Sequence, residues 1–309
     1  MKEIAVDRRA SLAKQPDWFG ASALTNGRWA VAVKDGLNVL DRDLAITEHH
    51  SFPKRLPDTW SGNLARICPF THRVAMVSWP QVDVRGIAGP VQEFDVPSGD
   101  SSFASGVHFE DDSILFVAPP VNNPGDPYRL VRGILDSGDV ETIAELTCYG
   151  VFEIFVRPSF PGIVVVAQDG PDFICLDWVE PNDEGFEVTS IRDGFHDLSP
   201  SGNRFVKSGV SLDFGRWPSL ERTGLVDADR LKSLLPANGE WPYVFSRFLD
   251  EDRVCAWNVY APELGVFDAA TGEVIDTWSV PLDSIVSVTH RNGETLLVGE
   301  SELIVTMDI

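Results

Sequence analysis

The sequence has few basic residues. Its 309 residues include 25 Lys and Arg against 47 Asp and Glu, which gives a formal net charge of −22 at pH 7. A protein that neutralises nucleic-acid phosphates needs a basic face, and anionic lipid surfaces attract basic segments for the same reason. The charge therefore predicts that neither nucleic acid nor a membrane surface is a partner.

Long apolar runs are also missing. No stretch of about 18 apolar residues occurs, so no transmembrane helix is expected. The first residues, MKEIAVDRRASLAKQPDW, lack the apolar segment of a secretory signal. These two absences predict a cytoplasmic protein.

Cysteine is scarce, and its four positions form no CxxC pair: Cys68, Cys148, Cys175 and Cys255. Three of them lie in strand-like segments. Because free cysteine behaves as a small apolar residue, we expect buried, reduced thiols. A disulfide or zinc framework is the alternative.

Familiar catalytic motifs are absent as well. The chain has no G-x-S-x-G elbow, no HExxH, no P-loop and no dinucleotide fingerprint. It also has no Asp-rich calcium loop of the DxDxDG type. We therefore expect no cofactor and no metal site from the sequence.

The chain does contain a repeated pattern of short strands. Its clearest unit is WPYVFSRFLDEDRVCAWNVYAPELGVFDAATGEVIDTWSVP (residues 241–281), which divides into YVFSRFL, RVCAWNV, LGVFDAA and EVIDTWSV. Gly, Asp, Asn and Pro turns separate these apolar runs, which is a strand and hairpin signal. Four antiparallel strands in about 40 residues are typical of a propeller blade.

The same order recurs along the chain. Further blades are expected over residues 18–52, 60–97, 103–147, 151–191 and 195–235. The Asn26-Gly27 and Asp35-Gly36 steps in the first of these are strong hairpin signals, because both tolerate positive φ. Residues 227–235 (DADRLKSLL) predict one short helix, capped by Asp227 or Asp229.

The two ends of the chain complement each other. Residues 285–309 supply only three strands, whereas Glu3 to Arg8 form one spare strand before the first full blade. If this spare strand pairs with the last three, the ring closes and no sheet edge is left exposed. A pair of β-sandwiches would give a similar strand density, but it would not explain the missing and the spare strand.

The segments VFDAATGEVI (266–275) and HDLSPSGNRFV (196–206) resemble turns of the seven-bladed β-propeller superfamily, the broad group of WD40-like, YVTN-like and quinoprotein-like repeats. The resemblance implies an all-β, seven-bladed propeller in which the N-terminal strand closes the last blade. It covers residues 1–309 as a single domain. The Trp-Asp signature of true WD40 repeats is absent, because Asp17-Trp18 and Asp177-Trp178 have the reverse order.

The up-and-down strand order sorts the connections onto two faces. The loop face carries the links between blades and the second-to-third-strand loops, and the turn face carries the remaining turns. All four tyrosines and five of the nine tryptophans are expected on the loop face. Aromatic side chains there either plug gaps between sheets or form a recognition surface. The predicted binding residues are Trp60, Trp79, Tyr128, Arg216, Trp217, Trp241, Tyr243, Tyr260 and Glu263.

Two long segments stand out on this face. They are APPVNNPGDPY (118–128) and SGVSLDFGRWPSLE (208–221), and both are longer than a hairpin needs. Arg216 and Trp217 are the preferred anchors, because Arg and Trp are frequent interface hot spots. Four histidines, by contrast, are expected near first-to-second-strand turns on the turn face: His72, His108, His196 and His290.

Two functions from different classes are consistent with these patterns. The first is a non-catalytic propeller that binds a protein or peptide through the loop face, with the charge of −22 favouring basic partners. The second is an enzyme, a hydrolase, lyase or isomerase, with its site at the mouth of the central channel. Its candidate polar groups are Asp58, Asp169, Asp172, Glu263 and Arg216.

Overall fold

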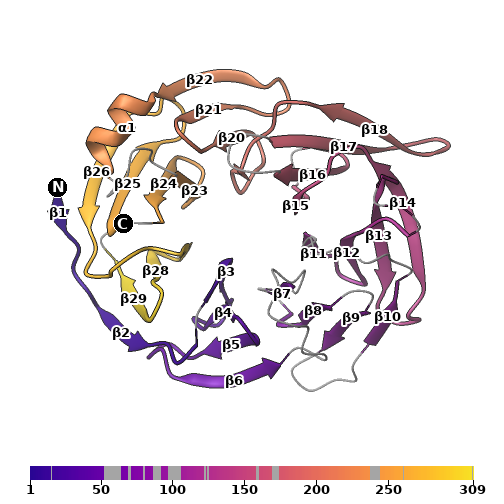
Figure 1. The fold of residues 1–309 in the computed structure, drawn as a ribbon, viewed down its shortest axis with the longest axis horizontal. Helices are drawn as coiled ribbons and strands as arrows, with labels where there is room; N and C mark the ends of the chain where they lie inside the picture. Colours follow the sequence, from indigo (N-terminus) through magenta and orange to yellow (C-terminus); the bar gives the residue numbers. More distant parts are fainter. Residues whose placement is uncertain are drawn as a thin grey trace.

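The strands of the computed structural model form seven sheets arranged as the blades of a ring (Figure 1). The structure describes residues 1–14, 16–51, 64–68, 71–78, 81–85, 92–96, 106–121, 123, 125–157, 160–168, 174–236, 244–259, 261–307 and 309. The predicted seven-bladed β-propeller is therefore confirmed.

Blades 1 to 5 each contain four strands in chain order, as the blade pattern predicts, and blade 6 contains four such strands and a fifth, β1 (Lys2–Glu3), beside its outermost strand β26 (Val274–Ser279). Blades 1 to 3 comprise β3 (Pro16–Ala23), β4 (Trp29–Val33), β5 (Gly36–Leu40), β6 (Ile46–Ser51), β7 (Leu64–Ile67), β8 (Val74–Ser78), β9 (Gln81–Arg85), β10 (Gln92–Asp95), β11 (Val107–Phe109), β12 (Ser113–Ala118), β13 (Tyr128–Ile134) and β14 (Val140–Leu146). Blades 4 to 6 comprise β15 (Val151–Phe155), β16 (Ile163–Gln168), β17 (Ile174–Asn182), β18 (Gly185–Ile191), β19 (Asp197–Leu198), β20 (Arg204–Lys207), β21 (Leu212–Arg216), β22 (Glu221–Val226), β23 (Val244–Phe248), β24 (Arg253–Asn258), β25 (Glu263–Asp268) and β26 (Val274–Ser279).

Blade 7 is composite. It contains β27 (Ser287–Arg291), β28 (Glu294–Val298) and β29 (Glu302–Thr306), and its outermost strand is β2 (Arg8–Ser11) from the other end of the chain. β2 pairs antiparallel with β29, with Arg8 opposite Val305. Both ends of the chain accordingly lie on the same side of the ring in Figure 1.

The position of the closing strand differs from the prediction of Glu3 to Arg8. Those residues instead lead from β1 (Lys2–Glu3), which pairs parallel with β26 of blade 6, across to β2. Ile4 is buried between blades 6 and 7, and its N–H donates to Ser279 O at 3.1 Å. Because the side chain of Ile4 packs between blades 6 and 7, the residues around it do not form the outer strand of blade 7.

Burial separates the inner from the outer strands of each blade. Every residue of β4 and β12 is buried, because second strands pack between neighbouring sheets on both faces. The outer strand β18, by contrast, contains only exposed and half-buried residues. The apolar clusters lie between adjacent blades, as in the cluster that joins blades 3 and 4. The hydrophobic core therefore lies in the layers between adjacent blades.

The short helix is found where the sequence predicts it. α1 (Ala228–Leu234) connects blades 5 and 6, and Asp227 caps it by accepting the Arg230 N–H at 2.8 Å. Leu231 and Leu235 are fully buried against the two blades. In the described part of the chain, no helix is long and apolar enough to cross a membrane.

The cysteines follow the prediction only in part. Cys68 and Cys255 are buried free thiols, and burial raises the pKa of Cys255 to about 12. Cys148 and Cys175, however, form a disulfide whose Cα atoms are 6.0 Å apart. The prediction of four reduced thiols is therefore wrong for this pair. Cys148 follows the outer strand of blade 3, and the packing of blade 4 against that strand brings it beside Cys175 at the start of β17.

Candidate functional site

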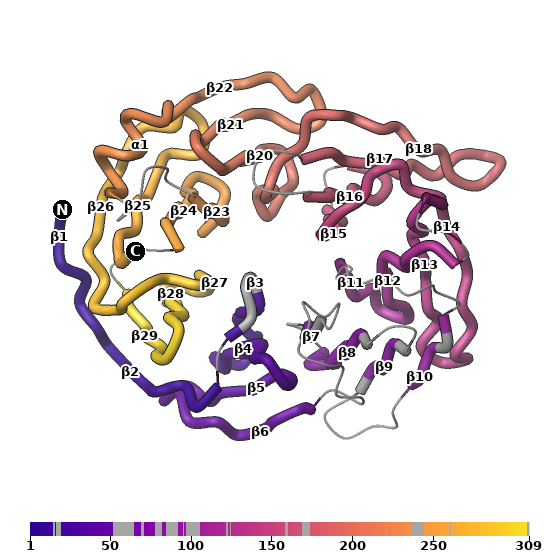
Figure 2. The backbone as a smooth tube through the Cα atoms, viewed as in Figure 1, coloured from indigo at the N-terminus to yellow at the C-terminus, as the bar shows by residue number. Residues whose placement is uncertain are grey.

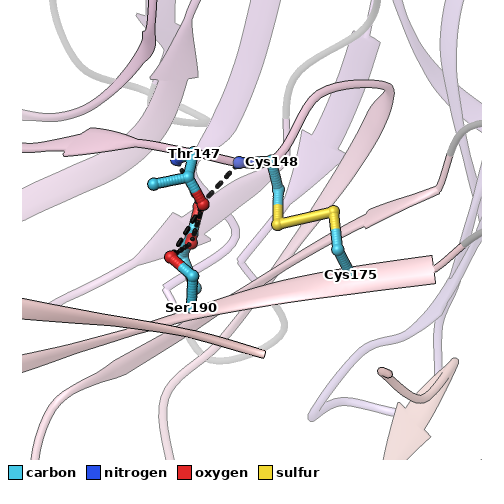
Figure 3. The surroundings of a disulfide bond; sticks show 5 residues. Thr147, Cys148, Cys175 and Ser190 are labelled. Carbon is cyan, nitrogen blue, oxygen red and sulfur yellow. Dashed lines mark hydrogen bonds between the residues drawn. A yellow bond between two sulfur atoms is a disulfide. The ribbon is translucent and has the colours of Figure 1, made fainter. Parts of the chain in front are cut away.

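The link between blades 3 and 4 is held by the buried carboxylate of Asp177, close to the disulfide between Cys148 and Cys175 that Figure 3 shows. Its Oδ2 accepts the backbone N–H groups of Thr147 and Cys148 at 2.8 and 3.0 Å. Its Oδ1 accepts the hydroxyls of Thr147 and Ser190 at 2.8 and 2.6 Å. The disulfide to Cys175 fixes the same link covalently. Hydrogen bonds and a covalent bond together hold the backbone of this link in place.

This fixed link presents exposed apolar side chains on the loop face. Tyr149 is 54% exposed and Val151 is 46% exposed. The neighbouring second-to-third-strand loop of blade 3 adds Val121, which is 41% exposed. Beside the link, the rings of Tyr128 and Phe152 pack with centroids 4.8 Å apart. Tyr128 thus lies on the predicted face.

Glu263 also lies on the loop face, at the start of β25. Its carboxylate oxygen Oε2 is buried without a hydrogen-bond partner among the described residues. Burial raises the pKa of this carboxyl above its ordinary value. The loop face therefore carries a partly desolvated acidic group in addition to its aromatic side chains.

Arg216 and Trp217 do not lie in a second-to-third-strand loop, so this prediction is wrong. Arg216 ends the third strand β21, and Trp217 lies in the turn that follows it, on the turn face. Trp217 is only 5% exposed, and its ring contacts those of Phe160, Trp178 and Phe195. The loop after β20 spans only residues 208–211, because apolar Leu212 and Phe214 already belong to the third strand.

The remaining predicted binding residues lie outside the described residues: Trp60, Trp79, Trp241, Tyr243 and Tyr260. The same holds for three polar groups of the enzyme alternative: Asp58, Asp169 and Asp172. That alternative stays a prediction.

A second candidate site lies in the centre of the ring, where the first strands of the blades face one another (Figure 2). A cavity of about 310 Å³ is lined there by residues of blades 1 to 7. Its charged lining residues come from blades 2, 4, 5 and 6: Arg66, Glu153, Arg157, Asp197 and Arg247. The channel is thus polar at its centre, although the blades around it are packed with apolar side chains.

Arg247 and Glu153 form a two-pronged ion pair across the cavity. Nη2 and Nη1 of Arg247 donate to the two Glu153 oxygens at 2.7 and 3.2 Å. Burial acts to raise the pKa of Glu153, but the charge and hydrogen bonds of Arg247 outweigh it and hold that pKa below its ordinary value. Glu153 is therefore ionised at neutral pH.

Asp197 lies on the other side of Arg247, with Oδ1 at 3.7 Å from Nη1. Its Oδ2 accepts the Phe248 N–H at 2.8 Å, and Oδ1 accepts the Leu198 N–H at 2.9 Å. Burial raises the pKa of Asp197 above its ordinary value despite the nearby arginine. Its charge is thus incompletely compensated.

Arg157 is held mainly by backbone groups. Its Nε donates to Ser199 O and its Nη1 to Val156 O, both at 3.2 Å. The guanidinium stands over the Phe155 ring, 5.4 Å from the centroid. Burial lowers the pKa of Arg157, and the attraction of Asp197 and more distant carboxylates does not offset it. This cation is also incompletely compensated.

The histidines lie near first-to-second-strand turns, as predicted. His72 lies in the turn between β7 and β8, and His108 and His290 are the next-to-last residues of the first strands β11 and β27. His196 lines a cavity of about 40 Å³ that shares Glu153 and Arg247 with the central one. Its Nδ1 accepts the Ser208 N–H at 2.9 Å, and burial lowers its pKa to about 4. Among the described residues, no three His, Cys, Asp or Glu side chains are grouped as metal ligands.

Sequence reasoning missed the charged cluster of the channel. Four of its five members lie in the short segments LARI, VFEIF, HDL and VFSRF, and the fifth, Arg157, follows two residues after VFEIF. A single charged residue inside an otherwise apolar first strand is the signal that could have found them, because first strands face the channel.

Comparisons with known proteins agree with the fold. The structure is similar to virginiamycin B lyase from Staphylococcus aureus, with a TM-score of 0.62 and 14% identity over 97% of this chain and 99% of that one. It is also similar to a chain of the Mitotic Checkpoint Complex, with a TM-score of 0.69 and 8% identity over 99% and 92%. The computationally designed Ika8 protein matches with a TM-score of 0.57 and 11% identity over 96% and 98%.

The chain shares the propeller architecture of these proteins. No family model and no curated protein matches its sequence. At such low identities the likeness concerns the fold, so the function has to be argued from the sites themselves.

Proposed function

We propose that this propeller is an interaction module that binds a protein or peptide through its loop face. The observation that supports this most directly is the link between blades 3 and 4. Its backbone is fixed by Asp177 and the disulfide, while Tyr149 and Val151 are about half exposed.

Rigid exposed aromatics suit this role for a physical reason. Binding costs free energy when flexible loops and side chains become ordered, and a fixed backbone avoids part of that cost. Tyrosine offers a large contact area with a polar tip, and it is frequent among interface hot spots. Tyr149 is therefore the expected anchor, with Val121 and Val151 adding apolar area around it.

The partner is expected to be basic. A net charge of −22 attracts cationic segments and repels acidic ones. Glu263, on the same face, has a buried oxygen without a partner among the described residues, and a donor from a lysine or arginine would satisfy it. Protein recognition by this face is therefore expected to weaken as the salt concentration rises.

A selection from a phage-displayed library of random peptides tests the proposal. Peptides enriched on the wild-type protein should carry an excess of Lys and Arg. Their affinity, measured by fluorescence anisotropy, should fall about 30-fold in Tyr149→Ala, the loss typical of an aromatic hot spot.

Phe186→Ala is the matched control. Phe186 is another exposed aromatic of blade 4, 39% exposed at the β17–β18 turn on the opposite face. This variant should bind the peptides like the wild type. Enrichment of no peptide, or equal binding by Tyr149→Ala and the wild type, would refute the proposed face.

A further inference from the structure

We propose that a small pocket at the loop-face end of the channel binds a side-chain hydroxyl group, that of a serine or threonine in the partner peptide. This inference rests on the proposed function, because the pocket adjoins the loop face beside Val151. It is carried by the position of the pocket, by two buried serine hydroxyls without partners and by a histidine next to them.

The pocket is the cavity of about 40 Å³ that His196 lines between blades 4, 5 and 6. Its described lining residues lie near the loop-face ends of strands. Val151 begins β15, Gln168 ends β16 and Ser208 follows β20. Val151 is also one of the half-exposed side chains of the loop face. The pocket thus adjoins the surface that the partner is proposed to cover.

Ser246 is held in place by contacts on both sides of it along β23. The N–H of Val244 donates to Gly209 O at 3.1 Å, and the N–H of Phe248 donates to Asp197 Oδ2 at 2.8 Å. Both bonds join blade 6 to blade 5. Side chains two residues apart in a strand point to the same side, and Val244 and Phe248 pack in the cluster between these blades. The Ser246 side chain therefore faces blade 5 as well.

Two serine hydroxyls of the pocket are buried without a partner. Ser208 is 4% exposed and Ser246 is 3% exposed. The Oγ of each has no hydrogen-bond partner among the described residues. A buried hydroxyl that makes no hydrogen bond costs free energy, and proteins satisfy the large majority of such groups. Both hydroxyls are therefore available to a ligand.

His196 adds a hydrogen-bond donor beside these hydroxyls. Its Nδ1 accepts the N–H of Ser208 at 2.9 Å. Burial lowers its pKa to about 4, so the ring is neutral at pH 7. A neutral imidazole whose Nδ1 accepts a hydrogen bond carries its proton on Nε2. The pocket thus offers three donors to an oxygen atom, one from this ring and one from each serine.

The size and charge of the pocket favour a hydroxyl group. Its volume of about 40 Å³ exceeds the roughly 30 Å³ that one water molecule occupies in the liquid, so a hydroxyl fits together with the one or two carbons that carry it. Glu153 and Arg247 line the pocket and pair with each other. A carboxylate would be repelled by the first and an ammonium group by the second. A primary amide would bring two N–H donors next to the donor of His196.

The peptides selected on the wild-type protein test the source of the hydroxyl. Those whose binding depends on Tyr149 should share a Ser or Thr at one fixed spacing from their basic residues. Replacing that residue of the peptide by Ala should lower the affinity for the wild type about tenfold, because three hydrogen bonds are lost. The same replacement should cost less than about threefold in the variant Ser208→Ala/Ser246→Ala, since groups in contact are coupled.

This double variant should fold, because each substitution removes a buried hydroxyl that has no partner among the described residues. Ser284→Ala is the matched control. The Oγ of Ser284 is also buried without a partner among the described residues, but Ser284 does not line the pocket. In this control the Ala replacement in the peptide should cost the same tenfold as in the wild type.

A crystal soaked in ethanol tests the pocket without any peptide, because ethanol has the heavy atoms of a threonine side chain. Its oxygen should lie about 3 Å from Nε2 of His196 and from the Oγ atoms of Ser208 and Ser246. Water alone in the pocket of the soaked crystal would overturn the assignment of a hydroxyl site.

The outcomes separate this inference from the proposed function. Tyr149-dependent peptides without a preferred Ser or Thr, or with Asn or Gln in its place, would overturn the inference and leave the loop face standing. Enrichment of no peptide would refute the loop face and, with it, the peptide as the source of the hydroxyl. The ethanol soak then decides by itself whether the pocket takes a hydroxyl group.

Discussion

Asp177 and Asp197 are buried aspartates of the adjacent blades 4 and 5, and they differ in how fully their charge is compensated. Asp177 accepts four hydrogen bonds, from two backbone amides and two hydroxyls. Asp197 accepts two from backbone amides, and its nearest arginine stands at 3.7 Å. Asp177 has no exposed surface, whereas Asp197 lines the central cavity.

The difference shows how one residue type serves structure in one place and a binding cavity in another. A carboxylate whose lone pairs are all engaged fixes the chain around it, and removing it leaves its donors buried without partners. A carboxylate that is only partly engaged contributes less to stability, but it sets the electrostatic potential of the cavity beside it. Substitution of Asp177 should therefore mainly lower stability, whereas substitution of Asp197 should mainly change the electrostatic potential of the central cavity.

The largest effect is expected for Asp177→Ala. Two backbone N–H groups and two hydroxyls would lose a buried charged acceptor, which should lower the free energy of unfolding by about 4 kcal/mol. Urea denaturation followed by tryptophan fluorescence measures this loss. Asp193→Ala is the control, because its pair with Lys207 is exposed and should contribute less than about 1 kcal/mol. A loss below about 1 kcal/mol in Asp177→Ala would show that this carboxylate does not hold the link.

Loss of the disulfide is expected to have a somewhat smaller effect. Cys148 and Cys175 close a loop with a sequence separation of 27, so the double variant Cys148→Ser/Cys175→Ser should lose about 3 kcal/mol of stability. Denatured wild-type protein without reductant should react with maleimide at two of its four thiols. Four reactive thiols would contradict the disulfide. Counting the maleimide-reactive thiols of the protein in cell extracts tests the predicted cytoplasmic location, because disulfides are rare in the cytosol.

The smallest effect is expected for Asp197→Asn. At pH 7 its stability should lie within about 1 kcal/mol of the wild type, because the amide oxygen still accepts the Phe248 N–H. The pKa of Asp197 is raised in the folded state, so the native protein binds this proton more readily than the unfolded chain. Wild-type stability relative to the variant should therefore rise as the pH falls from 7 through the folded pKa. A loss of several kcal/mol at pH 7 would make Asp197 as structural as Asp177.

The architecture could be predicted because strand patterns and turns are local. The segment RVCAWNV corresponds to β24, which spans Arg253–Asn258, and the helix predicted over 227–235 corresponds to α1. Gly27 has the positive φ that its Asn-Gly turn implies. Each of these features depends on neighbouring residues, which a single sequence displays.

The features that could not be predicted depend on contacts between distant segments. Cys148 pairs with Cys175 because of how blades 3 and 4 pack, and Glu153 meets Arg247 across a separation of 94 residues. The prediction placed Trp217 in the wrong connection for a local reason. β21 is short, and the turn at Pro218 that follows it looks in the sequence like the end of a longer loop. The charged cluster of the channel becomes visible only after the ring is assembled.

The closure of the ring also determines when the protein can finish folding during synthesis. The carboxylate of Asp7 accepts the N–H of Met307, a residue 300 positions later in the chain, and β2 pairs with β29 beside this contact. At about 5–20 residues per second a ribosome needs between about 15 and 60 s to make that span. Throughout this time β2 lacks its partner strand, so its edge stays unpaired until β29 has been synthesised.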